Sequence, residues 1–94
     1  MNGRLEGAGD AFPAGSRVAF ASRVLGGHAG EVIRHAWLFD GRLQQSIPLR
    51  LGGPDWRTHS AKLILHPGAW AVEARDDAGH VLARSEFSCR PDSP

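Results

Sequence analysis

Hydrophobic and polar residues alternate along most of this chain, and the alternation predicts a series of short β-strands. From Ser16 onward, Val18, Phe20 and Val24 are apolar and are separated by small or polar residues. An apolar residue at every second position is typical of a strand with one buried face. Residues 32–39 form the most apolar run, so we expect them to be a central strand.

The alternation continues between Arg42 and Leu51, where apolar side chains and Gln45 share one face. Arginine, glutamine and serine residues share the other face. Pro48 lies within this segment and cannot donate a backbone hydrogen bond. The segment is therefore expected at the edge of a sheet or at a bulge.

Three further strands are predicted downstream. The segment from Arg57 to Leu65 again alternates, and its two faces consist of Ala61, Leu63 and Leu65 on one side and Thr58, Ser60 and Lys62 on the other. Trp70, Val72 and Ala74 form one later apolar face, and Val81, Ala83 and Phe87 form another. Asp40-Gly41 and the residues 76–79 (Asp-Asp-Ala-Gly) have the composition of tight hairpin turns.

The predicted fold is all-β: a small antiparallel β-sandwich, immunoglobulin-like, with six to seven strands about ten residues apart. A small closed barrel is the alternative architecture. The Gly-rich residues 1–15 are expected to be a flexible lead-in and residues 16–89 a single domain. The polar residues 90–94 are expected to be a frayed tail.

The charge balance argues against a nucleic-acid-binding protein. The 94 residues include 11 basic and 10 acidic side chains, whereas nucleic-acid domains need a basic excess to contact phosphates. No apolar run has the roughly 20 residues of a transmembrane helix, and the first residues do not resemble a signal peptide. We therefore expect no membrane insertion by this chain and, as written, a cytoplasmic location, although a piece of a larger exported protein would look the same.

The residues of common catalytic and metal-binding motifs do not occur at the required spacings. Cys89 is the single cysteine, so neither a disulfide framework nor a cysteine-rich zinc site is expected. The five histidines include no His-x-His or His-Glu-x-x-His pairing. A Gly-x-Ser-x-Gly elbow and a phosphate-binding Gly-Lys-Ser/Thr loop are also missing from the sequence. We therefore expect no cofactor, no metal and no catalytic residues.

Several stretches of the chain form a recognisable pattern: residues 35–37, 40–41, 49–54, 56–62, 68–73 and 79–82, with Phe87 at the end. The most specific is the Trp-Arg-Thr-x-Ser-x-Lys string at residues 56–62. Together these stretches resemble a bacterial family that is catalogued as domain of unknown function 2914. The resemblance covers about Val18 to Phe87 and implies a bacterial protein. Because the family's domain often occurs in longer proteins with membrane-anchoring segments, the resemblance also allows an envelope location. The resemblance implies no enzymatic activity.

One predicted face combines an aromatic ring, two hydroxyls and an ammonium group: Trp56, Thr58, Ser60 and Lys62. An aromatic ring stacks on the apolar face of a sugar, while hydroxyl and charged groups bond its rim. The alternative is an ordinary solvent-facing strand, in which Lys62 protects an edge from mispairing. Trp56 would then be a plug at the end of the core.

His35 and Trp37 share one face of the central strand, and Arg34 lies on the other. Which face is buried is left open. His35 is either a buried, hydrogen-bonded structural residue or part of a pocket beside Trp37 that titrates near neutral pH. Arg57 lies opposite the hydroxyl-bearing face, where it either pairs with a carboxylate such as Asp55 or binds an anion. The candidate ligand-binding residues are thus His35, Trp37, Trp56, Arg57, Thr58, Ser60 and Lys62.

Three functions are compatible with this sequence. The first is a non-catalytic binding or accessory module that recognises a glycan or an anionic polyhydroxylated ligand. The second is a structural or protein-interaction domain, such as a homodimer joined through an open sheet edge. The third is a small enzyme that uses His35 or His59 as a general base in a pocket between the sheets.

Overall fold

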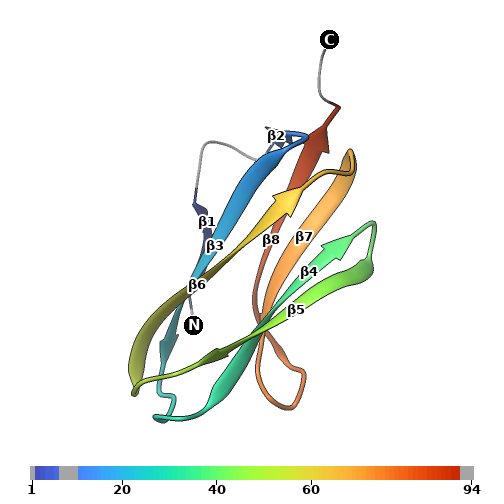
Figure 1. The fold of residues 1–94 in the computed structure, drawn as a ribbon. Helices are drawn as coiled ribbons and strands as arrows, with labels where there is room; N and C mark the ends of the chain where they lie inside the picture. The colour runs from blue at the N-terminus through green and yellow to red at the C-terminus, as the bar shows by residue number, and fades with distance from the viewer. Residues whose placement is uncertain (1, 7–10, 92–94) are drawn as a thin grey trace.

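The computed structural model describes residues 2–6 and 11–91, with side chains from residue 11 onward, and folds them into two stacked β-sheets (Figure 1). The strands are β1 (Asn2–Glu6), β2 (Ala11–Pro13), β3 (Ser16–Leu25), β4 (Val32–Phe39), β5 (Arg42–Arg50), β6 (Asp55–Ile64), β7 (Gly68–Arg75) and β8 (Val81–Arg90). No helix occurs in the described part of the chain. The all-β prediction is confirmed.

The two sheets form a β-sandwich. The smaller sheet has the strand order β1-β3-β6, and the larger one has the order β2-β8-β7-β4-β5. All neighbouring strands run antiparallel except β2 and β8, which are parallel. In Figure 1, β6 and β3 cross in front of the larger sheet, and β5 forms the outer edge beside β4. The predicted small sandwich is confirmed.

Two parts of the segment expected as a lead-in form strands, since β1 pairs with β3 and β2 pairs with β8. Phe12 of β2 is buried, and its ring meets that of Phe87 edge-on with centroids 5.6 Å apart. This packing anchors a segment whose composition resembles a loop. Strand β8 also continues to Arg90, the first residue of the expected tail. Residues 1, 7–10 and 92–94 of the two predicted flexible ends lie outside the described residues.

The core lies between the two sheets and is built mainly from alternate residues of β3, β4, β7 and β8. Val18 and Phe20 of β3 face Trp37 of β4 and Val72 of β7, and all four are at most 1% exposed. Phe87 of β8 meets the Trp37 ring edge-on, with centroids 6.3 Å apart. Aromatic rings bury a large apolar area each, so these side chains contribute strongly to the stability of the small domain.

Both predicted hairpin turns are present. Asp40 and Gly41 connect β4 to β5 with φ angles of 51° and 78°, the positive values that a tight hairpin turn of the predicted kind requires. Between β7 and β8, the Oδ1 atom of Asp76 accepts hydrogen bonds from the backbone N–H groups of Ala78 and His80. These local contacts explain why the composition alone located both turns.

The position of Pro48 is also as predicted, because β5 is an edge strand of the larger sheet. Strand β6 is the corresponding edge strand of the smaller sheet. The two strands approach each other on one side of the sandwich, where the Nζ atom of Lys62 donates to the Oε1 atom of Gln45 at 3.2 Å. We call this side, bounded by β5 and β6, the open side of the sandwich.

The interpretation of β6 as a solvent-facing hydroxyl row is corrected by the register of the smaller sheet. Ser60 lies opposite Phe20, and Lys62 lies opposite Val18, so both share a face with core residues of β3. Leu63 and Leu65, on the side that the sequence suggested for the core, are 51% and 56% exposed. The partner strand and the second sheet, rather than the alternation within β6, decide which face is buried.

Candidate functional site

The structure divides the seven candidate ligand residues among three places. His35, Trp37 and Ser60 lie inside the core. Trp56, Thr58 and Lys62 lie along the inner face of β6 and reach the surface at the open side. Arg57 alone lies on the outer face of the smaller sheet. They therefore do not form one continuous surface.

A hydrogen-bonded histidine joins the two sheets in the centre of the core. The Nε2 atom of His35 lies 2.5 Å from the Oγ atom of Ser22, and its Nδ1 atom lies 2.7 Å from the Oγ atom of Ser60. The Nε1–H group of Trp37 donates to the same Ser60 oxygen at 3.2 Å. Phe20 covers the imidazole edge-on, with centroids 4.8 Å apart. Residues of β3, β4 and β6 thus form one polar network surrounded by aromatic rings.

The His35 ring is held neutral by its surroundings. Burial is the main reason that its pKa falls from 6.5 to about 4, and the nearby charge of His59 lowers it further. A neutral imidazole has one donor nitrogen and one acceptor nitrogen, and a serine hydroxyl serves either of them. Because His35 and Trp37 are both 0% exposed, the structure favours the structural interpretation of His35 over a ligand pocket that titrates near neutral pH.

Trp56 presents the aromatic surface of the open side. Its side chain is 42% exposed, and its ring lies against the backbone of Gly52. A Cβ atom at Gly52 would lie only 2.4 to 2.8 Å from three carbons of the indole ring. The ring therefore rests on a surface that only glycine leaves free, while much of it faces solvent.

Thr58 and Lys62 follow Trp56 along the same face of β6, and both are half-buried. The distance from Trp56 to Lys62 is six residues, about 20 Å in a strand. Ser60 interrupts this row, because it is 6% exposed and its hydroxyl is engaged with His35. The open side thus presents the Trp56 ring and the Thr58 hydroxyl at one end of β6 and the Lys62 ammonium group nearer the other end.

Arg57 has a different environment from the one suggested by its sequence neighbours. In the register of the smaller sheet it lies opposite Arg23, and the carboxylate of Asp55 is held by Arg23 through hydrogen bonds of 2.8 and 2.7 Å. These bonds hold the pKa of Asp55 below its usual value, and the charge of Arg57 adds a smaller effect. Arg23 is therefore the residue that pairs with Asp55, which was one of the possible partners of Arg57 in the sequence.

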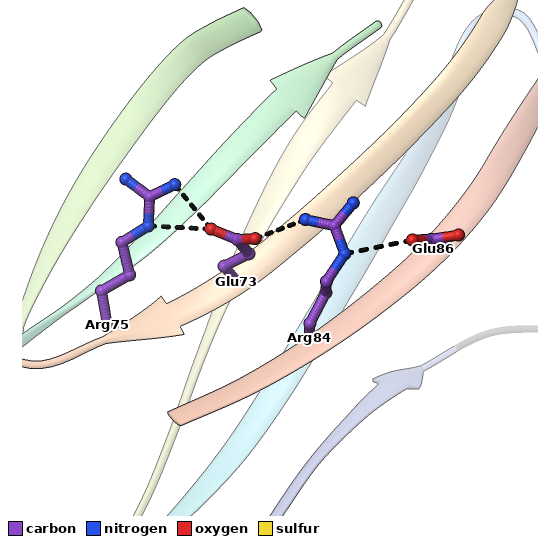
Figure 2. Close-up of polar contacts among 4 residues, drawn as sticks. All are labelled: Glu73, Arg75, Arg84 and Glu86. Carbon is purple, nitrogen blue, oxygen red and sulfur yellow. Dashed lines mark hydrogen bonds and ion pairs between the residues drawn. The ribbon is translucent and has the colours of Figure 1, made fainter. Parts of the chain in front are cut away.

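An ion-pair network that was not predicted from the sequence lies on the outer face of the larger sheet (Figure 2). Arg75 donates through Nε and Nη2 to one oxygen of Glu73, at 2.9 and 2.5 Å, and Arg84 donates to the other oxygen. Arg84 also donates to Glu86 at 3.1 Å. The sequence signal for this network was the spacing Glu-x-Arg at residues 73–75 and Arg-x-Glu at residues 84–86, because residues two apart lie on the same face of a strand. The pairing of Glu73 with Arg84 follows only from the register of β7 and β8.

Glu73 is the centre of this network and is only 7% exposed. Burial raises the pKa of Glu73, but the hydrogen bonds from Arg75 and Arg84 outweigh it and hold the pKa below its usual value. Glu73 therefore remains ionised and compensates two guanidinium groups.

A depression of about 180 Å³ lies beside Ala71, Arg84 and Glu86, which is smaller than the ligand pockets that usually enclose a substrate. No group of three His, Cys, Asp or Glu residues is arranged to hold a metal ion within the described residues. The described chain also contains no helix of sufficient length and apolarity to span a membrane.

Comparison with known proteins gives a fold neighbour and a family. No curated protein matches this chain. A solved structure with a similar fold is the "Crystal Structure of beta-glucosidase from Listeria innocua in complex with glucose", with a TM-score of 0.64 and 12% sequence identity. The match covers 99% of this chain and 16% of the β-glucosidase chain, and it shows the fold alone. A family model matches residues 30–89, and this chain therefore belongs to the family described as "Protein of unknown function (DUF2914)".

Proposed function

We propose that this protein is a non-catalytic binding or accessory module and that its ligand contacts the open side around Trp56. The observation that carries this proposal is the Trp56 ring, which is 42% exposed although it lies on the inner face of β6. An indole fixed against the Gly52 backbone loses little side-chain freedom when a ligand stacks on it.

The chemistry of the neighbouring residues favours a glycan or a related polyhydroxylated ligand. The exposed part of an indole ring stacks on the C–H face of a sugar, and the Thr58 hydroxyl offers a hydrogen-bond partner on the same strand face. Lys62 and Gln45 extend the polar surface along the strands, and the ammonium group suits an anionic substituent. His35, Trp37 and Ser60 would support this surface from the core and would not touch the ligand.

The strand order supports the finer assignment of an immunoglobulin-like module. Strands β3 and β6 pair in one sheet, as strands B and E do in immunoglobulin domains. Strands β4, β7 and β8 lie side by side in the other sheet and correspond to strands C, F and G. Trp37 is buried on β4, the counterpart of the strand that holds the core tryptophan of those domains. The bacterial source is inferred from the family resemblance.

The proposal is tested by titrating the protein with chitin and cell-wall oligosaccharides while recording amide and indole NMR signals. We expect saturable shifts of the Trp56 indole and of the Thr58 amide. The variant Trp56→Ala should abolish them, whereas Leu63→Ala, on the opposite face of the same strand, should leave them intact. Fragments that leave the Trp56 signals unmoved at millimolar concentration would remove the glycan proposal.

A second candidate function is protein interaction through the open sheet edges. The observation in its favour is that Leu63 and Leu65 are more than half exposed at the β6 edge. Light scattering across a concentration series tests this second function, and Leu63→Lys should dissociate a dimer formed through the β6 edge. The enzyme alternative has less support, because His35 is enclosed in the core and His59 lies exposed on the outer face.

A further inference from the structure

Three arginines lie at neighbouring register positions on the outer face of the larger sheet, at the end opposite the β4–β5 turn. Arg34 of β4 lies directly opposite Arg75 of β7. Arg50 of β5 lies opposite Val32, two residues before Arg34 on β4. Side chains directly opposite each other have Cβ atoms about 5 Å apart, and diagonal neighbours about 7–8 Å. The three guanidinium groups are thus within reach of one another across three adjacent strands.

The burial of the neighbouring residues shows that all three side chains point away from the core. Ile33 and His35 flank Arg34, Ala74 precedes Arg75, and Leu51 follows Arg50. All four neighbours are at most 1% exposed and face inward. Because side chains alternate along a strand, the arginines share the outer face.

The carboxylates on this face leave the arginines undercompensated. Glu73 is the acid that contacts the group, and it already binds Arg75 through one oxygen and Arg84 through the other. Within residues 11–91, no hydrogen bond or ion pair joins Arg34 or Arg50 to an acidic side chain. Among residues 11–91, the face therefore combines two guanidinium groups that have no acidic partner with a third that Glu73 holds in a fixed orientation.

Like charges directly opposite each other in a sheet are destabilising, so the register of Arg34 and Arg75 has a cost in the isolated domain. An oxyanion placed between them removes that cost, and guanidinium groups bind such anions through paired hydrogen bonds. A phosphoryl group offers several oxygens and up to two charges, which suits three converging guanidinium groups better than a single carboxylate does.

We propose that Arg34, Arg50 and Arg75 form a binding site for a soluble phosphoryl compound. The site lies on the outer face of the larger sheet, whereas the Trp56 surface lies on the inner face of β6. It is therefore independent of the proposed glycan surface.

The proposal is tested by titrating the intact protein with inorganic pyrophosphate at constant ionic strength, balanced with sodium chloride. We expect saturable shifts of the Arg34, Arg50 and Arg75 amide and guanidinium signals. Arg34→Gln should weaken the apparent affinity about tenfold or more, which corresponds to about 1.4 kcal/mol. Arg17→Gln, the same charge change on β3 of the other sheet, should leave the affinity unchanged.

The unfolding free energy of Arg34→Gln provides the second readout. We expect it to equal or exceed that of the parent protein, because the variant removes a like-charge contact. Weaker binding then reflects a lost contact with the anion. Shifts that follow ionic strength alone, or an equal loss of affinity in Arg17→Gln, would overturn the proposal. Citrate that binds as tightly as pyrophosphate would overturn the phosphoryl assignment.

Discussion

The Oγ atom of Ser60 lies 2.7 Å from the Nδ1 atom of His35, and this contact joins an edge strand of one sheet, β6, to an interior strand of the other, β4. The same oxygen accepts the indole N–H of Trp37. One small hydroxyl therefore satisfies two buried polar groups of β4. A fully satisfied buried network of this kind stabilises one particular stacking of the two sheets.

Replacing Ser60 with alanine should destabilise the fold by about 1–3 kcal/mol, because the His35 Nδ1 atom and the Trp37 Nε1–H group lose their partner in the core. Urea denaturation measures the change. The matched control is Ser46→Ala on β5, where the serine is exposed and the expected change is within about 0.5 kcal/mol. Equal effects of the two substitutions would show that Ser60 has no special role in the core.

Acid should weaken the fold well before the carboxylates protonate. Because burial lowers the pKa of His35 from 6.5 to about 4, the unfolded chain binds a proton in this range that the folded chain does not. The His35 contribution is complete above pH 6.5 and is lost as the pH falls toward 4, by at most about 1.4 kcal/mol per pH unit.

Urea denaturation at a series of pH values measures this slope, and the His35 ring signals should show no titration near neutral pH. The variant His28→Asn, in the exposed β3–β4 turn, should have the same slope as the parent protein. Stability that is constant between pH 6.5 and about pH 4 would contradict the buried neutral histidine.

Glu73→Gln should destabilise the protein by about 1–3 kcal/mol, because it leaves Arg75 and Arg84 without the carboxylate that they share. Glu86→Gln is the control. Its carboxylate contacts Arg84 but is 72% exposed, so we expect a change below about 1 kcal/mol. Thermal or urea unfolding of both variants measures the two changes in unfolding free energy. Equal losses in the two variants would contradict the importance of the burial of Glu73.

Gly52→Ala should displace the Trp56 ring, because the new methyl group would lie 2.4 to 2.8 Å from the ring carbons. The indole NMR signal and the fluorescence maximum of Trp56 should both change. Gly53→Ala is a matched control in the same turn, since a Cβ atom there meets nothing within 4 Å. If the glycan proposal holds, only the first substitution weakens oligosaccharide binding. Identical spectra of the two variants would contradict the Trp56–Gly52 contact.

Much of the fold could be predicted from local signals. The Asp40-Gly41 and Asp76–Gly79 turns depend on residues that favour the turn conformation by themselves. Pro48 marked an edge strand because its missing N–H group excludes a central position. Strands β1 and β2 could not be predicted, because their Gly-rich surroundings resemble a loop and their order comes from pairing with β3 and β8.

The candidate site was less predictable than the fold. The sequence correctly placed Trp56, Thr58, Ser60 and Lys62 on one strand face, since that follows from the strand period. It did not reveal that this face is turned inward, where Ser60 is hydrogen-bonded in the core and Trp56, at 42%, is the most exposed of the four. The Arg75–Glu73–Arg84 network was missed because its members become neighbours only through strand pairing.

By itself, then, the sequence determined the strand periods, the two hairpin turns and the edge position of β5, because each depends on residues close together in the chain. The tertiary structure decided which face of β6 is buried and which arginines converge on β4, β5 and β7. The physical reason is that alternation gives every strand two faces, and only the partner strands and the opposite sheet determine which one water reaches.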